Sequence, residues 1–276
     1  MSATGTSLPP SSAVPRYEVH AIRFAHRDAQ RQDHFYGTVE DPTGPMPIDY
    51  YIWVARSAND VVVLDAGYTP ETSALRAPTD GRTYLQSPLE TLRGLGVALA
   101  DVGTLSLSHL HYDHTGFLGS FTDARVVVQE RELAFWCGRD AGRPHVANLC
   151  APDDVAQLVR RNLAGEVRLV DGQAEIAPGI TAHRVGGHTP GTQVVRIPTG
   201  DGWVVIASDA SHFSANYEQR RPYAVVHTLP LMYDAFDRLD ELASRPELVI
   251  PGHDPAVMER FSASSAELQG LAVRIA

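Results

Sequence analysis

A six-residue segment from His109 to His114 constrains this chain more than any other part of its sequence. It reads HLHYDH and directly follows an apolar, strand-like run, residues 104–108. In an extended segment alternate side chains point the same way, so His109 and His111 share one side. A turn after them brings Asp113 and His114 toward a second point. Because such groups are costly to bury together without a cation, the segment predicts two metal ions side by side.

Three further stretches end apolar strands with a residue that can bind metal. His188 lies in the glycine-rich turn GGHTPG, Asp209 follows a strand-like run at 203–207, and His253 follows another at 248–250. Any one of them alone is better explained as the end of a strand, where Gly, Asp and His are common. Their shared position at strand ends favours one common site.

Composition narrows the kind of partner. The 276 residues carry a formal net charge of −10, which argues against nucleic acid because phosphate binding needs a cationic face. No apolar run approaches the length of a membrane span. The two cysteines, Cys137 and Cys150, are expected to be buried free thiols. We therefore expect a small-molecule partner and no membrane association, with monomer and homodimer both open.

The amino-terminal residues, 1–16, are expected to be a flexible tail. They are rich in Ser, Thr, Pro and Ala and lack the basic start and apolar core of a secretory signal, so a cytoplasmic location is expected. Residues 17–276 contain no repeat and no linker-like shift in composition. With 43% hydrophobic residues in the chain, this region is expected to form one domain with a substantial core.

The pattern of strands and helices favours two packed sheets with helices outside. Strands are expected at 17–24, 48–55, 61–64, 104–107, 124–128, 167–170, 180–185, 193–197, 203–207 and 248–250, with the second and third forming a hairpin. Helices are expected after Ser87, with a capping box to Glu90, from Glu130, from Pro152, and across 232–242. The loops expected to govern substrate choice are 25–47, 138–149 and 213–229, the last with an arginine pair, Arg220 and Arg221, that is a candidate for meeting a carboxylate.

These motifs together resemble the metallo-β-lactamase superfamily, whose pattern HxHxDH is followed by a separate His, Asp and His. All seven positions are matched, and the order of the strands fits from about residue 17 onward. The resemblance implies an α/β fold of the α+β type, a four-layer αββα sandwich. It implies one metal held by His109, His111 and His188, a second held by Asp113, His114 and His253, and Asp209 bridging both. Asp65 matches the superfamily's buried acid in a D-x-G turn, where it would hold the ligands in place.

Ligands that are mostly nitrogen, with two carboxylates and no cysteine, fit two zinc ions best, and iron, manganese or cobalt stay open. Two such metals would share a hydroxide formed from water of lowered pKa, which makes a hydrolase acting on a carbonyl compound the expected enzyme. Asp113 is the candidate that carries the proton to the departing alkoxide.

Within the superfamily the sequence is most similar to the N-acyl-homoserine lactonases, which are quorum-quenching enzymes. The similarity lies in the chain length, the HLHYDHTG form, the SDAS segment around Asp209 and the GHD that ends at Asp254. It implies an N-acyl-homoserine lactone or a related lactone as substrate. Those lactonases typically place a tyrosine three residues after the bridging aspartate, where this chain has His212. Its imidazole is a candidate donor to the developing oxyanion, the alternatives being a loop histidine facing solvent and a role for Tyr217 or Tyr223.

Several other activities stay open. A thioester hydrolase of the glyoxalase II type uses the same seven ligands, but it normally carries a basic, helical carboxyl-terminal region, and only 23 residues follow His253. Another esterase of this fold and a mononuclear iron dioxygenase also share much of the pattern. A β-lactamase usually lacks the carboxylate at Asp209, and a nuclease would need a cationic surface. A non-catalytic metal-binding protein is the alternative of a different class.

Overall fold

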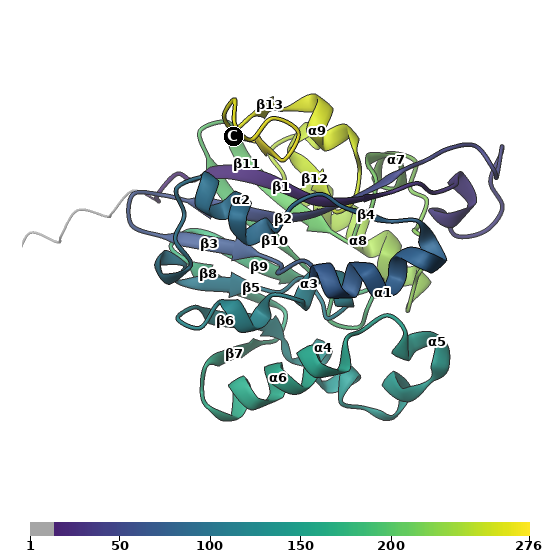
Figure 1. Ribbon diagram of the computed structural model, residues 1–276, viewed down its shortest axis with the longest axis horizontal. Helices are drawn as coiled ribbons and strands as arrows, with labels where there is room; N and C mark the ends of the chain where they lie inside the picture. Colours follow the sequence, from purple (N-terminus) through teal and green to yellow (C-terminus); the bar gives the residue numbers. More distant parts are fainter. Residues whose placement is uncertain (1–13) are drawn as a thin grey trace, which may run out of the picture.

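Two β-sheets packed face to face form the centre of the computed structural model, which describes residues 14–276 (Figure 1). In that range the larger sheet has nine strands in the order β13-β14-β1-β2-β3-β5-β6-β7, with β4 paired to β1. They are β1 (Glu18–Arg27), β2 (Ile48–Arg56), β3 (Val61–Leu64), β4 (Thr83–Tyr84), β5 (Thr104–Ser106), β6 (Arg125–Gln129), β7 (Val167–Val170), β13 (Ser262–Ala263) and β14 (Ala272–Arg274). The smaller sheet, in the order β12-β11-β10-β9-β8, contains β8 (Gln173–Ala177), β9 (Ile180–Arg184), β10 (Gln193–Thr199), β11 (Gly202–Ser208) and β12 (Val249–Pro251).

Three apolar layers join these sheets to the helices. One fills the space between the sheets and includes Trp53 and Ile206. A second joins the other face of the larger sheet to α2 (Pro88–Gly94), α4 (Glu130–Trp136) and α6 (Pro152–Leu163). The third joins the smaller sheet to α7 (Ser214–Glu218) and α8 (Leu229–Leu242). The expected α/β fold class, with helices outside two packed sheets, is confirmed.

Strand β2 shows how the sequence produces this layering. All its residues except the last are buried, and alternate side chains enter different layers. Ile52 and Val54 pack toward the helices, whereas Tyr51 and Trp53 pack against the smaller sheet. A strand covered on both faces must be apolar throughout, so it loses the alternation of an exposed strand.

The direction of the strands brings the loops that carry the chemistry to one edge. Strands β3, β5, β6 and β7 run parallel, and β11 runs parallel to β12. Parallel neighbours end at the same edge of a sheet, which is where ligands bind in such folds. The segments leaving these strand ends include Asp65 after β3, the HLHYDH segment after β5, Asp209 after β11 and His253 after β12. The HLHYDH segment itself turns into α3 (Tyr112–Thr115).

Most of the expected elements are present. The hairpin at 48–64 is confirmed, with Trp53 opposite Leu64 in antiparallel register. The expected helix after Ser87 begins at Pro88, but the Ser87 side chain makes no capping hydrogen bond, so the capping box is wrong. The expected loop at 138–149 contains α5 (Pro144–Ala147), and α9 (Ala256–Arg260) precedes the last two strands.

Helix α1 (Pro70–Asp80) was not expected from the sequence. It contains Pro78 and exposes Leu75, and Ser73 is its one buried residue, so it lacks the apolar stripe by which a surface helix is recognised. Its start is fixed locally, because Thr69 accepts a hydrogen bond from the backbone nitrogen of Thr72 at 3.3 Å.

Other expectations concern the ends and the surface of the chain. The expected tail, 1–16, lies outside the described residues except for its last three, of which Arg16 donates to the carbonyl of Thr199 at 2.9 Å. Cys137 and Cys150 are free as expected, but Cys137 is exposed and Cys150 partly so, and the expected burial is wrong.

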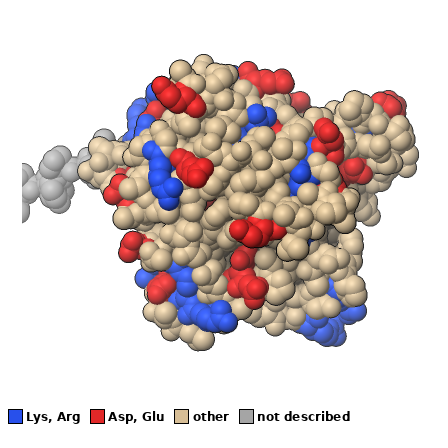
Figure 2. Space-filling model, in the orientation of Figure 1, with Lys and Arg blue, Asp and Glu red and all other residues tan. Residues whose placement is uncertain are grey.

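From residue 14 onward no helix has the length and apolar character that crossing a membrane requires. Figure 2 shows acidic and basic side chains interspersed over one face.

Candidate metal centre

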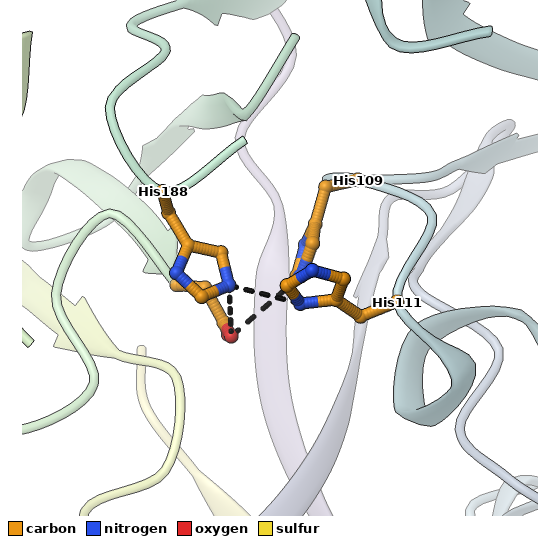
Figure 3. A group of neighbouring side chains, drawn as sticks. His109, His111 and His188 are labelled. Carbon is orange, nitrogen blue, oxygen red and sulfur yellow. Dashed lines mark hydrogen bonds and ion pairs between the residues drawn. The ribbon is translucent and has the colours of Figure 1, made fainter. Parts of the chain in front are cut away.

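Three histidines from two separate loops converge on one carboxylate. The imidazoles of His109, His111 and His188 point toward one another in Figure 3. With Asp209 they form a group whose ligand atoms all lie within 4.8 Å of one another. Oδ2 of Asp209 is 3.2 Å from Nε2 of His188 and 3.6 Å from Nε2 of His109. This is the group expected around the first metal.

The other oxygen of Asp209 faces a second group. Oδ1 lies 3.0 Å from Nε2 of His253 and 3.3 Å from Nε2 of His114. Asp113 completes this group, with its carboxylate oxygens 3.7 Å from His114 and 3.8 Å from His253. The two oxygens of one carboxylate therefore address two adjacent groups of ligands, which is the arrangement that a bridging ligand needs.

The buried polar atoms of this site suit divalent cations. His109 and His114 are almost completely buried, and the Nε2 atom of each has no hydrogen-bond partner within residues 14–276. Unpaired polar atoms at such depth are unfavourable unless another group binds them. Imidazole nitrogens and carboxylate oxygens are the ligands that zinc prefers in sites without cysteine, so the residues present fit the expected metals.

Burial and neighbouring charge set the protonation of the cluster in opposite directions. Burial and the nearby imidazoles hold the pKa of His109 well below its ordinary value. Burial also opposes the charge of His114, but the carboxylates of Asp209, Asp65 and Asp113 outweigh it and raise its pKa. Burial likewise disfavours the charged form of the Asp209 carboxylate. The surrounding imidazoles, of which His212 has the largest effect, nevertheless keep its pKa well below the usual range. An ionised carboxylate beside a neutral imidazole such as that of His109 is ready to bind cations.

Asp65 orients the ligands without joining them. Its Oδ1 accepts a hydrogen bond from the backbone nitrogen of Ser108 at 2.7 Å, and its Oδ2 accepts from Nδ1 of His114 at 2.8 Å. The hydroxyls of Ser108 and Ser208 also donate to Oδ2, at 2.8 and 3.1 Å. With Nδ1 of His114 occupied in this way, its Nε2 faces the cluster, as is usual for a histidine ligand. Asp65 has a φ of 63°, a left-handed conformation that aspartate tolerates.

Two other ligands are oriented by backbone carbonyls. Nδ1 of His188 bonds to the carbonyl of Val225 at 2.8 Å, and Nδ1 of His253 bonds to that of Asp49 at 2.8 Å. Each bond leaves Nε2 free for the cluster, so the two loops reach the site with their imidazoles already aligned.

The buried carboxylate of Glu132, on α4, is a supporting residue that sequence reasoning missed. Its Oε1 accepts from the backbone nitrogen of Leu110 at 3.0 Å, and from the indole nitrogen of Trp136 at 2.7 Å. Its Oε2 accepts from the hydroxyl of Thr189 at 2.6 Å and the backbone nitrogen of Gly191 at 2.8 Å. Glu132 therefore ties the HLHYDH loop to the loop of His188. An acidic residue in the first turn of a helix is common, so its sequence carried no signal of this role.

Position 212 is part of the cluster. His212 is 3% exposed, and its Nε2 lies 2.9 Å from Oδ2 of Asp209, so the alternative of a solvent-facing histidine is wrong. Burial holds its pKa well below the ordinary value, which keeps the imidazole neutral. Tyr223 stacks on it, whereas the hydroxyl of Tyr217 bonds to Asp240 and Tyr217 does not line the cavity over the site.

A cavity of about 190 Å³ opens over the two groups. Each loop range expected to govern substrate choice contributes lining residues, among them Arg27, Leu149 and Tyr223. The expectation for the arginine pair is wrong, because Arg220 pairs with Asp237 and Asp240 while Arg221 donates to the carbonyl of Thr38. An adjoining cavity of about 250 Å³ shares His111 and His188 and is lined largely by apolar side chains, including Phe135, Trp136, Val146 and Val226.

Comparison with known proteins agrees with this geometry. A sequence model described as the metallo-beta-lactamase superfamily matches residues 46–253. The N-acyl homoserine lactonase AiiB of Agrobacterium fabrum is 32% identical over 233 residues, which cover 79% of this chain and 83% of that protein. The N-acyl homoserine lactonase AiiA of Bacillus thuringiensis subsp. kurstaki is 28% identical over 165 residues, so the matched part spans 60% of its length and 59% of this chain. Among solved structures, the dizinc quorum-quenching lactonase AidC in complex with a product has a TM-score of 0.68 and 15% identity, covering 88% of this chain and 89% of that one.

Proposed function

Because this chain belongs to the metallo-beta-lactamase superfamily, we propose that it is a metal-dependent hydrolase that opens a lactone ring, that of an N-acyl homoserine lactone or a related lactone. The observation that carries the proposal is the position of Asp209, whose two oxygens face two separate groups of buried ligands. The lactone substrate is supported by the names of the similar proteins, which are N-acyl homoserine lactonases.

Two divalent metals fit the ligands present, and we propose zinc, with iron, manganese or cobalt as alternatives. His109, His111 and His188 would hold one ion, Asp113, His114 and His253 the other, and Asp209 would contact both. When bound, such ions supply a nucleophile from water at neutral pH and polarise the substrate carbonyl.

The chain's own polar groups would complete the reaction. Asp113 is the ligand group nearest to solvent, with 12% of its side chain exposed, and it lines the cavity. We assign it the uptake of the proton that the attacking water loses and the transfer of this proton to the departing alkoxide oxygen, because a carboxylate at the cavity wall reaches both solvent and substrate. The imidazole of His212 also lines the cavity, and it is assigned the donation of a hydrogen bond to the developing oxyanion. Its Nε2, which lies 2.9 Å from Oδ2 of Asp209, would turn from that oxygen to the oxyanion, because a neutral imidazole has only one N–H.

The adjoining apolar cavity gives a place for the non-reacting part of a substrate. It begins at His111 and His188 and is bounded by the rings of Phe135 and Trp136. An acyl or alkyl chain seated there would leave the ring carbonyl over the ligands.

The cytoplasmic location, the single domain from residue 17 and the choice between monomer and homodimer stay predictions of the sequence.

A metal measurement coupled to a hydrolysis screen tests the proposal. The metal content of the protein as purified is measured by elemental analysis, and the zinc-loaded protein is assayed on lactones, thioesters and β-lactams. Two metals per chain and opening of a lactone with the highest kcat/KM are expected. One iron per chain would indicate the dioxygenase instead, and a preference for thioesters would indicate the glyoxalase II type.

A further inference from the structure

Three arginines, which we call the arginine wall, line the cavity over the metal-ligand groups, and the proposed function does not use them. They are Arg27, Arg76 and Arg82, and Asp80 is the only lining carboxylate outside the metal-ligand groups among the described residues. Resting on the proposed function, we propose that these guanidinium groups bind a carboxylate carried by the substrate, so that the enzyme acts on acidic lactones in preference to neutral ones.

Arg82 is the fixed part of this wall. It is 7% exposed, yet it lines the cavity, and its guanidinium lies 5.1–5.4 Å from the ring centres of Tyr50, Tyr68 and Tyr112. It pairs with Asp80, while its Nη1 is buried without a hydrogen-bond partner in residues 14–276. A guanidinium has five N–H donors in a rigid plane, so an acceptor in the cavity would satisfy a donor that the protein leaves free.

Arg27 is the residue of the arginine wall that has no charged partner in the described part of the chain. It is partly buried, and within the described part of the chain its side chain forms no hydrogen bond or ion pair, with Nε itself buried. Taking a cation out of water without a counter-ion is unfavourable, and such a group is usually retained where a ligand supplies the missing charge. Arg27 and Arg82 line the same cavity where β4 pairs with β1, so a carboxylate bound between them would contact both.

Arg76 adds charge at the same wall. Its guanidinium stacks 3.5 Å over the ring of Tyr112 and donates to the carbonyl of Asn148 at 2.9 Å, so it too has no carboxylate partner among residues 14–276. Outside the metal-ligand groups the cavity lining therefore holds three guanidinium groups and one carboxylate, Asp80, among the described residues. Carboxylates are the anions whose planar shape arginine matches with two parallel hydrogen bonds.

The dimensions of the cavity favour a small ligand. The arginine wall and His188, Asp209 and His253 line the same cavity, whose volume is about 190 Å³. A five-membered lactone bearing one carboxylate is small enough for this volume, and it would place the ring carbonyl at the ligands and the acid at Arg27 and Arg82. Recognition by charge would then complement recognition by the apolar cavity.

The test compares two lactones that differ in one charge. The zinc-loaded full-length protein is assayed with 5-oxotetrahydrofuran-2-carboxylate and with its neutral primary carboxamide. We expect kcat/KM for the carboxylate to be about tenfold higher or more, and the ratio to fall toward one in Arg27→Gln. Arg27→Lys keeps the charge without the planar fork and should recover part of the ratio. Arg93→Gln removes the same charge from an exposed position in α2 that does not line the cavity, and it should leave the ratio unchanged.

A binding measurement separates this inference from the lactonase proposal. The ketone 3-oxocyclopentane-1-carboxylate cannot be hydrolysed, and its affinity is measured by calorimetry against that of its carboxamide. Tighter binding of the carboxylate that disappears in Arg27→Gln supports the inference even if no lactone is opened, an outcome that would refute the proposed function alone. Equal binding and equal turnover of the charged and neutral members, or a preference that survives Arg27→Gln, overturns the inference and leaves the lactonase proposal standing.

Discussion

The ring of Tyr223 lies flat on the imidazole of His212, with the ring centres 3.3 Å apart and the planes at 5°. Both rings line the cavity, and His212 at the same time contacts Asp209. The tyrosine therefore covers the histidine that stands three residues after the proposed bridging ligand. This relationship raises the question of which of the two groups assists the reaction.

Substitutions at Tyr223 answer that question. Tyr223→Phe keeps the stacked ring and removes the hydroxyl, so if His212 is the donor, kcat/KM should fall less than about threefold. Tyr223→Ala uncovers the imidazole and admits water, and a loss of about tenfold or more is expected. Steady-state kinetics on one lactone give the comparison. Equal losses in the two variants would instead assign the donor role to the tyrosine hydroxyl.

Replacing the proposed bridging ligand should separate metal content from folding. Asp209→Asn keeps the size of the side chain but removes the charge that both ligand groups share. We expect fewer than two metals per chain by elemental analysis and a loss of activity on the order of 100-fold or more. Asp171→Asn, on an exposed loop residue, is the control. A variant that kept two metals and full turnover would show that Asp209 does not bridge.

Asp65→Asn tests whether the buried acid acts through His114. Asparagine tolerates the left-handed conformation of this position, so the backbone should remain unstrained. The charged acceptor of Nδ1 of His114 is lost, and we expect zinc affinity to fall about 10- to 100-fold, measured by competition with a chelator. Unchanged affinity together with a lowered Tm would indicate that Asp65 supports only the fold.

The sequence predicted the residues of the site that lie in recognisable motifs. It missed the residues whose role depends on contacts with segments that are distant in the sequence. The histidines and aspartates could be identified from the sequence, because such residues are rarely gathered at strand ends without a ligand. The structure brings all seven together. Glu132 could not be found in this way, since its partners Leu110 and Thr189 come from distant loops and its own helix gives it an ordinary position.

The same distinction explains the arginines and the unexpected helix. Arg220 and Arg221 were adjacent in a loop that does reach the cavity, yet their side chains turn to Asp240 and Thr38. Arg27 and Arg82 lie in segments that carry no motif, and only the pairing of β4 with β1 brings them near each other. Helix α1 is held by its start at Thr69 and contributes one buried residue, so no periodicity revealed it.

Glu132→Gln should loosen the connection between the two ligand loops. The amide keeps one acceptor oxygen, but it places donors where the hydroxyl of Thr189 and the nitrogen of Gly191, or else Leu110 and Trp136, now donate. A decrease of about 1–3 kcal/mol in the free energy of unfolding is expected from the buried donors left unpaired. Denaturant unfolding of the metal-loaded protein measures it, with Glu130→Gln at an exposed position of the same helix as the control. If the two variants were equally stable, Glu132 would not hold the loops.

His183, on β9, should make stability depend on pH without involving the metal ligands. Burial and the neighbouring Arg238 and Arg196 lower its pKa to about 4, and its Nδ1 accepts from Arg238 while Nε2 bonds to Thr181. Because the unfolded histidine titrates near 6.5, the unfolded state binds the additional proton between about pH 6.5 and 4. The contribution of this group to stability is therefore complete above pH 6.5 and is lost as the pH falls toward 4.

The difference between the wild type and His183→Gln isolates this effect, since other pH-dependent groups are common to both. Between pH 7.5 and 5.0 the free energy of unfolding of the wild type should fall by about 2 kcal/mol more than that of the variant. Denaturant titrations at the two pH values give this number, and His145→Gln, on an exposed histidine of α5, should behave like the wild type. Parallel pH profiles for wild type and His183→Gln would show that the buried imidazole is protonated as readily in the folded protein as in the unfolded one.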